Sequence, residues 1–206
     1  MIKIDYTEVN GWQTAIRGMR NPMNSWQQSD SEWECKYDDV WFYNIGEKDL
    51  DLMKRLVKAG TDHSKFMRML TVNCDITAPR YWWTEFDTYK VGTVRNSCST
   101  MHKIHAKEFT LDDFSNEHCG GFLGGIIDTL NGWREQYCKT KDKEYWYAMI
   151  QLLPQSYNQR ATVQLNYAVL RNMHHGRKNH KLDEWHTFDE WIEALPYSQL
   201  ITMEAD

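Results

Sequence analysis

The sequence lacks the features that would tie it to a membrane or to a disulfide framework. It has an odd number of cysteines and no CxxC pair, which indicates reduced thiols; they are Cys35, Cys74, Cys98, Cys119 and Cys138. No apolar run approaches the ~20 residues that span a bilayer. The opening MIKIDYTEV has neither the charged nor the apolar region of a signal peptide. We therefore expect a soluble, cytoplasmic protein that does not bind membranes.

Several binding motifs are missing as well. There is no HExxH pattern, and the histidine spacings give no set of three or four convergent ligands, so we expect no metal. The glycines of residues 120–125 lack the spacing and the preceding strand of a phosphate-binding loop, and we interpret them as positions of close helix packing. The net charge of −5 argues against binding of duplex nucleic acid through the overall field.

What the sequence does contain is a large apolar and aromatic fraction. Of its 206 residues, 41% are hydrophobic and 14% aromatic, including 10 Trp. Such a chain is far too aromatic to be disordered, and its length suffices for one sizeable core. No segment rich in Gly, Pro or Ser interrupts it. We expect a single domain over residues 1–206.

Periodicity and helix-end signals predict the elements of the first half. Residues 2–7 alternate as a half-buried strand, and a short helix over 12–20 ends at Asn21-Pro22. Residues 24–45 show no period and are predicted to form an irregular loop. A helix follows over 47–59 with Gly60 at its end. The clearest strand runs over 70–78, and Pro79 begins the next helix.

The second half is mostly helical. Thr110 with Asp113, and Thr187 with Glu190, have the spacing of capping boxes. Apolar positions predict helices over 122–137 and 145–152, a short strand over 161–165 and a helix through residue 175. Helices mixed with a few strands, without regular alternation, indicate an α+β fold.

Two polar segments are candidates for ligand binding. The first is the loop after the aromatic helix, where hydroxyls, an amide and cations suit a phosphate or a base edge: Lys90, Arg95, Asn96, Ser97, Ser99, Thr100 and His102. The alternative is a solvated loop beside core aromatics. We expect the loop 90–102 to face the second segment.

That second segment is LRNMHHGRKNHK, residues 170–181. Its Arg171, His175, Arg177 and Lys178 form a local anion site in an otherwise acidic chain. The alternative is a solvated basic helix end, which the helix dipole favours.

Together these segments resemble the flavin-dependent thymidylate synthases (ThyX). The resemblance lies in WQTAIRGMRN, KAGTDHSKF, LTVNCDITAPRYWW and the segment from LPQSYNQ to DEWH. It implies a small, mostly antiparallel sheet flanked by helices, and a homotetramer with shared sites. Asn166 and Asn172 match family asparagines, and Arg177 matches the arginine that contacts the nucleotide. Ser99 matches the signature serine, with Asn96 three residues before it, and is the catalytic candidate.

The chain also departs from the family motif. The family's Arg-His-Arg reads Thr88-Tyr89-Lys90 here, and two further arginines are replaced by Met101 and Ala168. Because each charge-assisted contact contributes ~1.5–3 kcal/mol, we expect FAD to bind more weakly by orders of magnitude.

Three functional hypotheses remain open at this stage. The first is a nucleotide-binding protein, of a kind phages encode, that sequesters nucleotides or cyclic nucleotide signals in the host cytoplasm. The second is an active enzyme that methylates dUMP or a related pyrimidine nucleotide at C5, with FAD, NADPH and methylenetetrahydrofolate. The third is a structural subunit without a ligand.

Overall fold

The computed structural model describes residues 2–37 and 40–204, which form an α+β fold. Four strands make an antiparallel sheet in the order β1-β4-β6-β5. A separate two-stranded ribbon pairs β2 with β3. The strands are β1 (Lys3–Asn10), β2 (Glu32–Tyr37), β3 (Val40–Asn44), β4 (Thr71–Pro79), β5 (Val94–Ser97) and β6 (Asn158–Asn166). The sheet confirms the fold class expected from the sequence.

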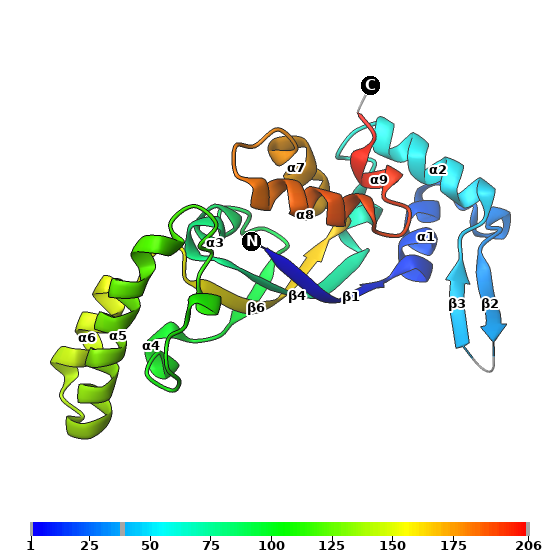
Figure 1. The fold of residues 1–206 in the computed structure, drawn as a ribbon. Coiled ribbons are helices and arrows are strands. Elements are labelled where there is room, and N and C mark those ends of the chain that lie inside the picture. Colours follow the sequence, from blue (N-terminus) through cyan, green and yellow to red (C-terminus); the bar gives the residue numbers. More distant parts are fainter. Residues whose placement is uncertain (1, 38–39, 205–206) are drawn as a thin grey trace. The chain divides into compact units, whose positions relative to one another are not determined.

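The helices follow the sequence pattern closely in most places (Figure 1). They are α1 (Trp12–Arg20), α2 (Glu47–Lys58), α3 (Arg80–Phe86), α4 (Thr100–Lys103), α5 (Gly120–Thr140), α6 (Lys143–Leu152), α7 (Tyr167–Arg177), α8 (Asp183–Glu193) and α9 (Gln199–Thr202). Short 3-10 turns occupy Asn21–Met23, Trp26–Gln28, Lys65–Arg68 and Leu111–Asp113. None of the helices within the described ranges combines the length and the apolar character needed to cross a membrane.

The chain forms two compact units. Unit 1 comprises residues 1–5, 75–88 and 95–163, and unit 2 comprises residues 6–74, 89–94 and 164–206. The single domain expected from the sequence stays a prediction.

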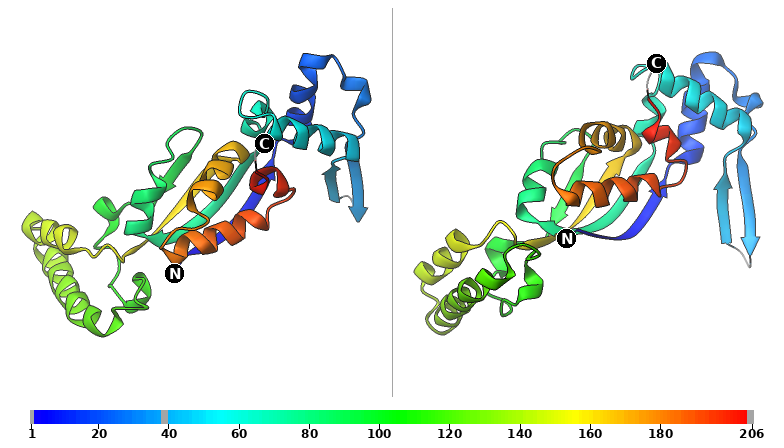
Figure 2. Two further views of the ribbon diagram at one scale, coloured as in Figure 1. Left: turned by 90° about the horizontal axis from the view of Figure 1, so that it is seen from above. Right: turned by 45° about the horizontal axis from the view of Figure 1, so that its top comes forward.

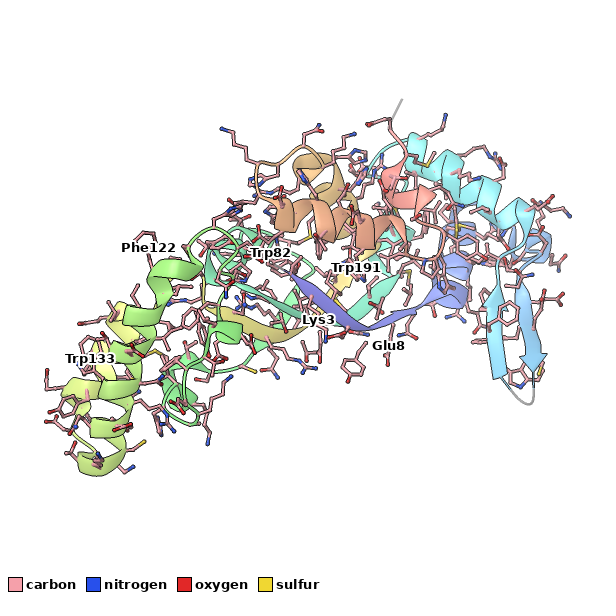
Figure 3. The ribbon with its side chains drawn as sticks, viewed as in Figure 1. Lys3, Glu8, Trp82, Phe122, Trp133 and Trp191 are labelled. Atoms are coloured by element: carbon pink, nitrogen blue, oxygen red, sulfur yellow. The ribbon has the colours of Figure 1, made fainter. Side chains whose placement is uncertain are left out.

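In unit 1, α5 and α6 pack side by side as a helical hairpin (Figure 2). Their buried face joins a cluster made of Ile104, Phe109, Phe114, Leu123, Ile127, Leu130, Met149 and Leu153. The glycines of α5 were expected to allow close helix packing, but within the described residues they do not. A Cβ added at Gly121, Gly124 or Gly125 would meet no atom within 4 Å among the described residues. Beside them Phe122 projects outward and is 87% exposed (Figure 3).

In unit 2, α7 packs against α8 and α9. The core there includes the fully buried rings of Trp185 and Phe188, with Leu170 and Met173 from α7. These apolar positions hold α7 in place. His174 is buried with them, whereas the other polar residues of the helix are at least partly exposed: Arg171, Asn172, His175 and Arg177.

A buried ion pair fixes the segment before the ribbon. The Nε of Arg20 lies 2.6 Å from Oδ1 of Asp49. The other carboxylate oxygen accepts hydrogen bonds from Ser29 Oγ at 2.6 Å and Ser31 Oγ at 2.7 Å. Burial alone would raise the pKa of Asp49, but these hydrogen bonds and the arginine charge outweigh it and hold the pKa below its usual range.

Two sequence predictions in unit 2 are wrong. Residues 24–45 are not an irregular loop, because β2 and β3 form an antiparallel ribbon within them. The helix expected to start at a Thr187–Glu190 capping box begins earlier, at Asp183 in the first turn of α8. In unit 1 the Thr110–Asp113 capping box is present, on a 3-10 turn. The ribbon escaped prediction because its rings pack against one another, a cross-strand effect without a local period.

Candidate functional site

A cavity of about 340 Å³ in unit 2 collects several of the predicted residues. Its wall combines the turn after α2, the glycine turn before β5 and the first turns of α7. The lining residues are Val57, Gly60, Thr61, Ser64, Met67, Arg68, Val91, Gly92, Asn166, Ala168, Val169, Arg171 and Asn172. Small-molecule sites fall in the range of about 300–1,000 Å³, so the cavity has room for one small ligand.

Asn166 is held at the base of α7. Its Oδ1 caps the helix by accepting from the backbone N of Val169 at 3.0 Å, and its Nδ2 donates to the carbonyl of Gly92 at 3.4 Å. Gly92 has φ +79°, and a Cβ there would come within 2.6 Å of Asn166 Nδ2. The glycine therefore lets the loop approach α7 closely and keeps one lining amide in a fixed position.

Arg171 reaches the cavity wall but is also committed to structure. Its guanidinium donates to the carbonyls of Ile201 at 2.9 Å and Met203 at 2.5 Å, at the end of α9. Burial lowers the pKa of Arg171, and the nearby Glu204 carboxylate opposes that shift. The charge predicted to meet an anion thus also closes the C-terminal turn of unit 2.

Sequence reasoning missed three polar residues of this cavity. Thr61, Ser64 and Arg68 come from the turn that follows α2. Ser64 Oγ donates to the carbonyl of Gly60 at 3.1 Å. The signal was present, because Thr61 and Ser64 lie in KAGTDHSKF, one of the segments that carry the resemblance, and Arg68 follows two residues after it.

Arg177 lies among aromatic rings of unit 2. Its Nε donates to the hydroxyl of Tyr89 at 3.1 Å, and its guanidinium carbon lies 5.0 Å from the ring centre of Trp185. Cations are attracted to such ring faces. Tyr89 therefore positions Arg177.

The rest of the basic segment is partly neutralised by the chain itself. Glu204 accepts from Lys178 Nζ at 2.9 Å and lies 3.6 Å from His175 Nδ1. Burial, followed by the charge of Arg171, lowers the pKa of His175. The Nε2 atom of this histidine is buried and has no hydrogen-bond partner among the described residues. One carboxylate of the chain thus neutralises part of the positive charge that was expected to meet an anion.

Arg95 belongs to unit 1, where its two terminal nitrogens are paired, while its buried Nε has no hydrogen-bond partner among the described residues. The guanidinium lies 3.9 Å from the ring centre of Trp83 and donates to Asp87 Oδ2 and Gln159 Oε1, both at 2.6 Å. This arrangement is closer to the alternative given for this loop, in which its polar residues lie beside core aromatics and bind no ligand.

The other predicted loop residues also lie in unit 1. Asn96 and Ser97 are exposed on β5, while Thr100 and His102 lie in α4. Ser99 caps α4, because its Oγ accepts from the backbone N of His102 at 3.0 Å. Lys90 belongs to unit 2 and is exposed. That the loop faces residues 171–181 stays a prediction.

One group of side chains in unit 2 has the donor set of a metal site. His174 on α7 and Asp189 and Glu193 on α8 each offer a ligand atom, all within 4.8 Å of one another. The Nδ1 of His174 lies 2.7 Å from Asp189 Oδ1, so the pair is already satisfied as a histidine–carboxylate contact. Among the described residues, these three are the group whose ligand atoms lie close enough together for a metal ion.

No protein-family model matches this sequence, and no curated protein matches it. Solved structures, in contrast, do match this chain. ThyX from Helicobacter pylori, complexed with FAD and dUMP, superposes with a TM-score of 0.75 at 16% identity, covering 98% of both chains. A second structure of that protein with FAD and dUMP gives 0.73 at 16% identity, covering 99% of this chain and 98% of the other. The chain therefore has the fold of the flavin-dependent thymidylate synthases.

Proposed function

Given this fold, we propose that the chain binds a pyrimidine nucleotide such as dUMP in the cavity of unit 2, and that it is a flavin-dependent enzyme of the thymidylate synthase type. The observation that carries the proposal is the lining of the cavity. It combines two asparagines, Asn166 and Asn172, with two arginines, Arg68 and Arg171, and contains no carboxylate among the described residues.

The chemistry of these side chains suits the ligand. An asparagine amide offers both a donor and acceptors, which is what the edge of a uracil ring requires. Arginine presents a planar fork that matches phosphate oxygens. Because Arg171 already donates to the end of α9, Arg68 is the cation that we assign to the phosphate.

The residues fit a flavin less well than a nucleotide. Ala168 at the cavity wall carries no charge, and the hydroxyl of Thr88 in unit 1 donates to the carbonyl of Glu85 at 2.7 Å. Tyr89 is occupied with Arg177. A bound flavin would supply the redox chemistry of the methylation. We expect it to be held weakly and to exchange with solvent.

Sequestration of a nucleotide without chemistry is the second candidate. It is favoured by the same stretch, Thr88-Tyr89-Lys90, in which only the lysine retains a charge. Titration of dUMP by calorimetry, with and without added FAD, followed by an assay for dUMP methylation, separates the two. Binding with FAD-dependent turnover supports the enzyme, and binding without turnover at saturating FAD supports sequestration.

The nucleotide site itself is tested by a matched pair of variants. We expect Arg68→Met to weaken dUMP binding about 10- to 100-fold, the value of one charge-assisted hydrogen bond. Arg55→Met removes another exposed arginine of unit 2, which pairs with Asp51 outside the cavity, and should leave affinity unchanged. Equal affinity of both variants and the parent would disprove the site assignment.

We also propose a homotetramer, on the basis of the resemblance. The exposed Phe122 and the open glycine positions on α5 support an interface there. Light scattering coupled to gel filtration measures the assembly directly, and a monomeric mass would refute it.

A further inference from the structure

A second cleft of unit 2, of about 610 Å³, is lined mainly by aromatic rings. It shares no residue with the nucleotide cavity. Its rings are Trp12, Trp33, Trp41, Phe42, Tyr43 and Tyr197. The polar lining residues Asn10, Gln13 and Thr14 carry no charge.

The β2–β3 ribbon supplies one wall. Its register pairs Trp33 with Tyr43 and Cys35 with Trp41, so these side chains share one face of the ribbon. Trp33 and Tyr43 meet edge to face, with ring centres 5.3 Å apart. Yet Trp33 is 51% exposed and Trp41 is 59% exposed. Large exposed rings that gather beside a cleft are typical of a binding surface and not of a packed core.

Trp12 and Tyr197 form another part of the lining. Trp12 and Tyr197 also meet edge to face, with ring centres 5.1 Å apart. Tyr197 has φ 53°, a left-handed conformation that costs a non-glycine residue energy. Two hydrogen bonds hold it there, because Tyr167 donates to the carbonyl of Pro196 at 2.5 Å and the backbone N of Ile45 donates to the Tyr197 hydroxyl at 3.3 Å. Strain of this kind concentrates where the geometry of a binding site must be kept.

The charge of the residues around the cleft indicates which kind of ligand it would bind. Around the ribbon, the described residues 30–37 and 40–47 include four acidic residues and one lysine, a net charge of −3. None of the described residues that line the cleft is charged. An anion would find no partner there, whereas a cation meets ring faces within a negative field.

We propose that this cleft is an aromatic site for an organic cation, either an alkylammonium or a guanidinium group. The two edge-to-face ring pairs present both faces and edges, and the faces attract positive charge. The site is independent of the nucleotide cavity, whose arginines select the opposite charge. Its cation comes from a free small molecule or from a lysine or arginine side chain of a partner polypeptide.

Calorimetry with three probes tests the charge requirement. Choline represents a free quaternary ammonium, 3,3-dimethylbutanol is its neutral isostere, and N-acetyl-arginine amide represents a side-chain guanidinium. We expect choline or the arginine probe to bind at least about 5-fold more tightly than the neutral alcohol. Preference for choline indicates a small-molecule ligand, and preference for the arginine probe indicates a polypeptide. Equal affinity for all three, or no binding at all, overturns the proposal.

Variants locate the site. Trp33→Leu and Trp41→Leu should each weaken binding of the preferred cation by about 2- to 30-fold, the value of one cation–π contact. Trp26→Leu is the control, because Trp26 is 48% exposed in the same unit but does not line the cleft. Circular dichroism confirms that each variant is folded. Undiminished binding by both ribbon variants, or an equal loss in Trp26→Leu, would also overturn the assignment.

Discussion

Gly92→Ala tests whether the glycine turn positions the nucleotide cavity. Gly92 has φ +79°, and its new Cβ would lie 2.6 Å from Asn166 Nδ2 and 3.1 Å from Val169 Cγ2. A left-handed conformation costs an alanine about 1–2 kcal/mol. Displacement of the Asn166 side chain costs about 1–2 kcal/mol more, because that side chain caps α7. We expect a total loss of about 2–4 kcal/mol in the free energy of unfolding.

The chain contains a matched control for this change. Gly60 also has a positive φ, +98°, but a Cβ there meets nothing within 4 Å. Gly60→Ala should therefore cost only the conformational part, about 1–2 kcal/mol. For a chain of this size, the melting temperature of Gly92→Ala should lie about 2–8 °C below that of Gly60→Ala.

Differential scanning calorimetry measures both variants, and dUMP titration of Gly92→Ala adds the functional readout. Because the displaced Asn166 lines the cavity, we expect weaker nucleotide binding as well. Equal melting temperatures for the two variants would refute the argument that the close approach of Gly92 to Asn166 matters.

Three further changes probe the charged groups. Asp49→Asn should cost about 3–5 kcal/mol, because Arg20 is left buried without its partner; urea unfolding measures the loss. Since the folded-state pKa of Asp49 lies below its unfolded value of about 3.9, the parent's stabilisation is complete above about pH 4 and is lost as pH falls through the folded-state pKa. Arg171→Met should loosen α9, whose terminal carbonyls it satisfies, with faster amide exchange there and a loss of about 1.5–3 kcal/mol; unchanged exchange contradicts this role. Arg95→Lys keeps the charge but loses the planar stack on Trp83. We expect the free energy of unfolding, measured by thermal unfolding, to fall by about 1 kcal/mol.

The elements predicted well from the sequence have strong local causes. The helix α1 ends at Arg20, directly before Asn21-Pro22, and α2 is followed by Gly60 in a left-handed conformation. In β4 the burial alternates as the residue pattern does. These features depend on side-chain period and on backbone preferences a few residues apart, so one sequence suffices to predict them.

The candidate site could be predicted only in part. Asn166, Arg171 and Asn172 were identified from the sequence and do line one cavity. The sequence could not show that Arg171 also closes α9, or that Arg95 is stacked on an aromatic ring. The sequence shows that a residue is cationic, but it does not show where the charge lies in the fold. Its partner is decided by segments tens of residues away.

The sequence by itself determined an α+β chain of marked aromatic content, with a basic segment near its end and a resemblance to the thymidylate synthase fold. Only the tertiary structure decided which cations are satisfied within the chain and which wall a cavity. It also turned residues 32–44 into a ribbon whose rings open onto a cleft. The physical reason is common to these outcomes: hydrogen bonds, ring contacts and ion pairs join residues distant in sequence, and their energies are absent from any local pattern.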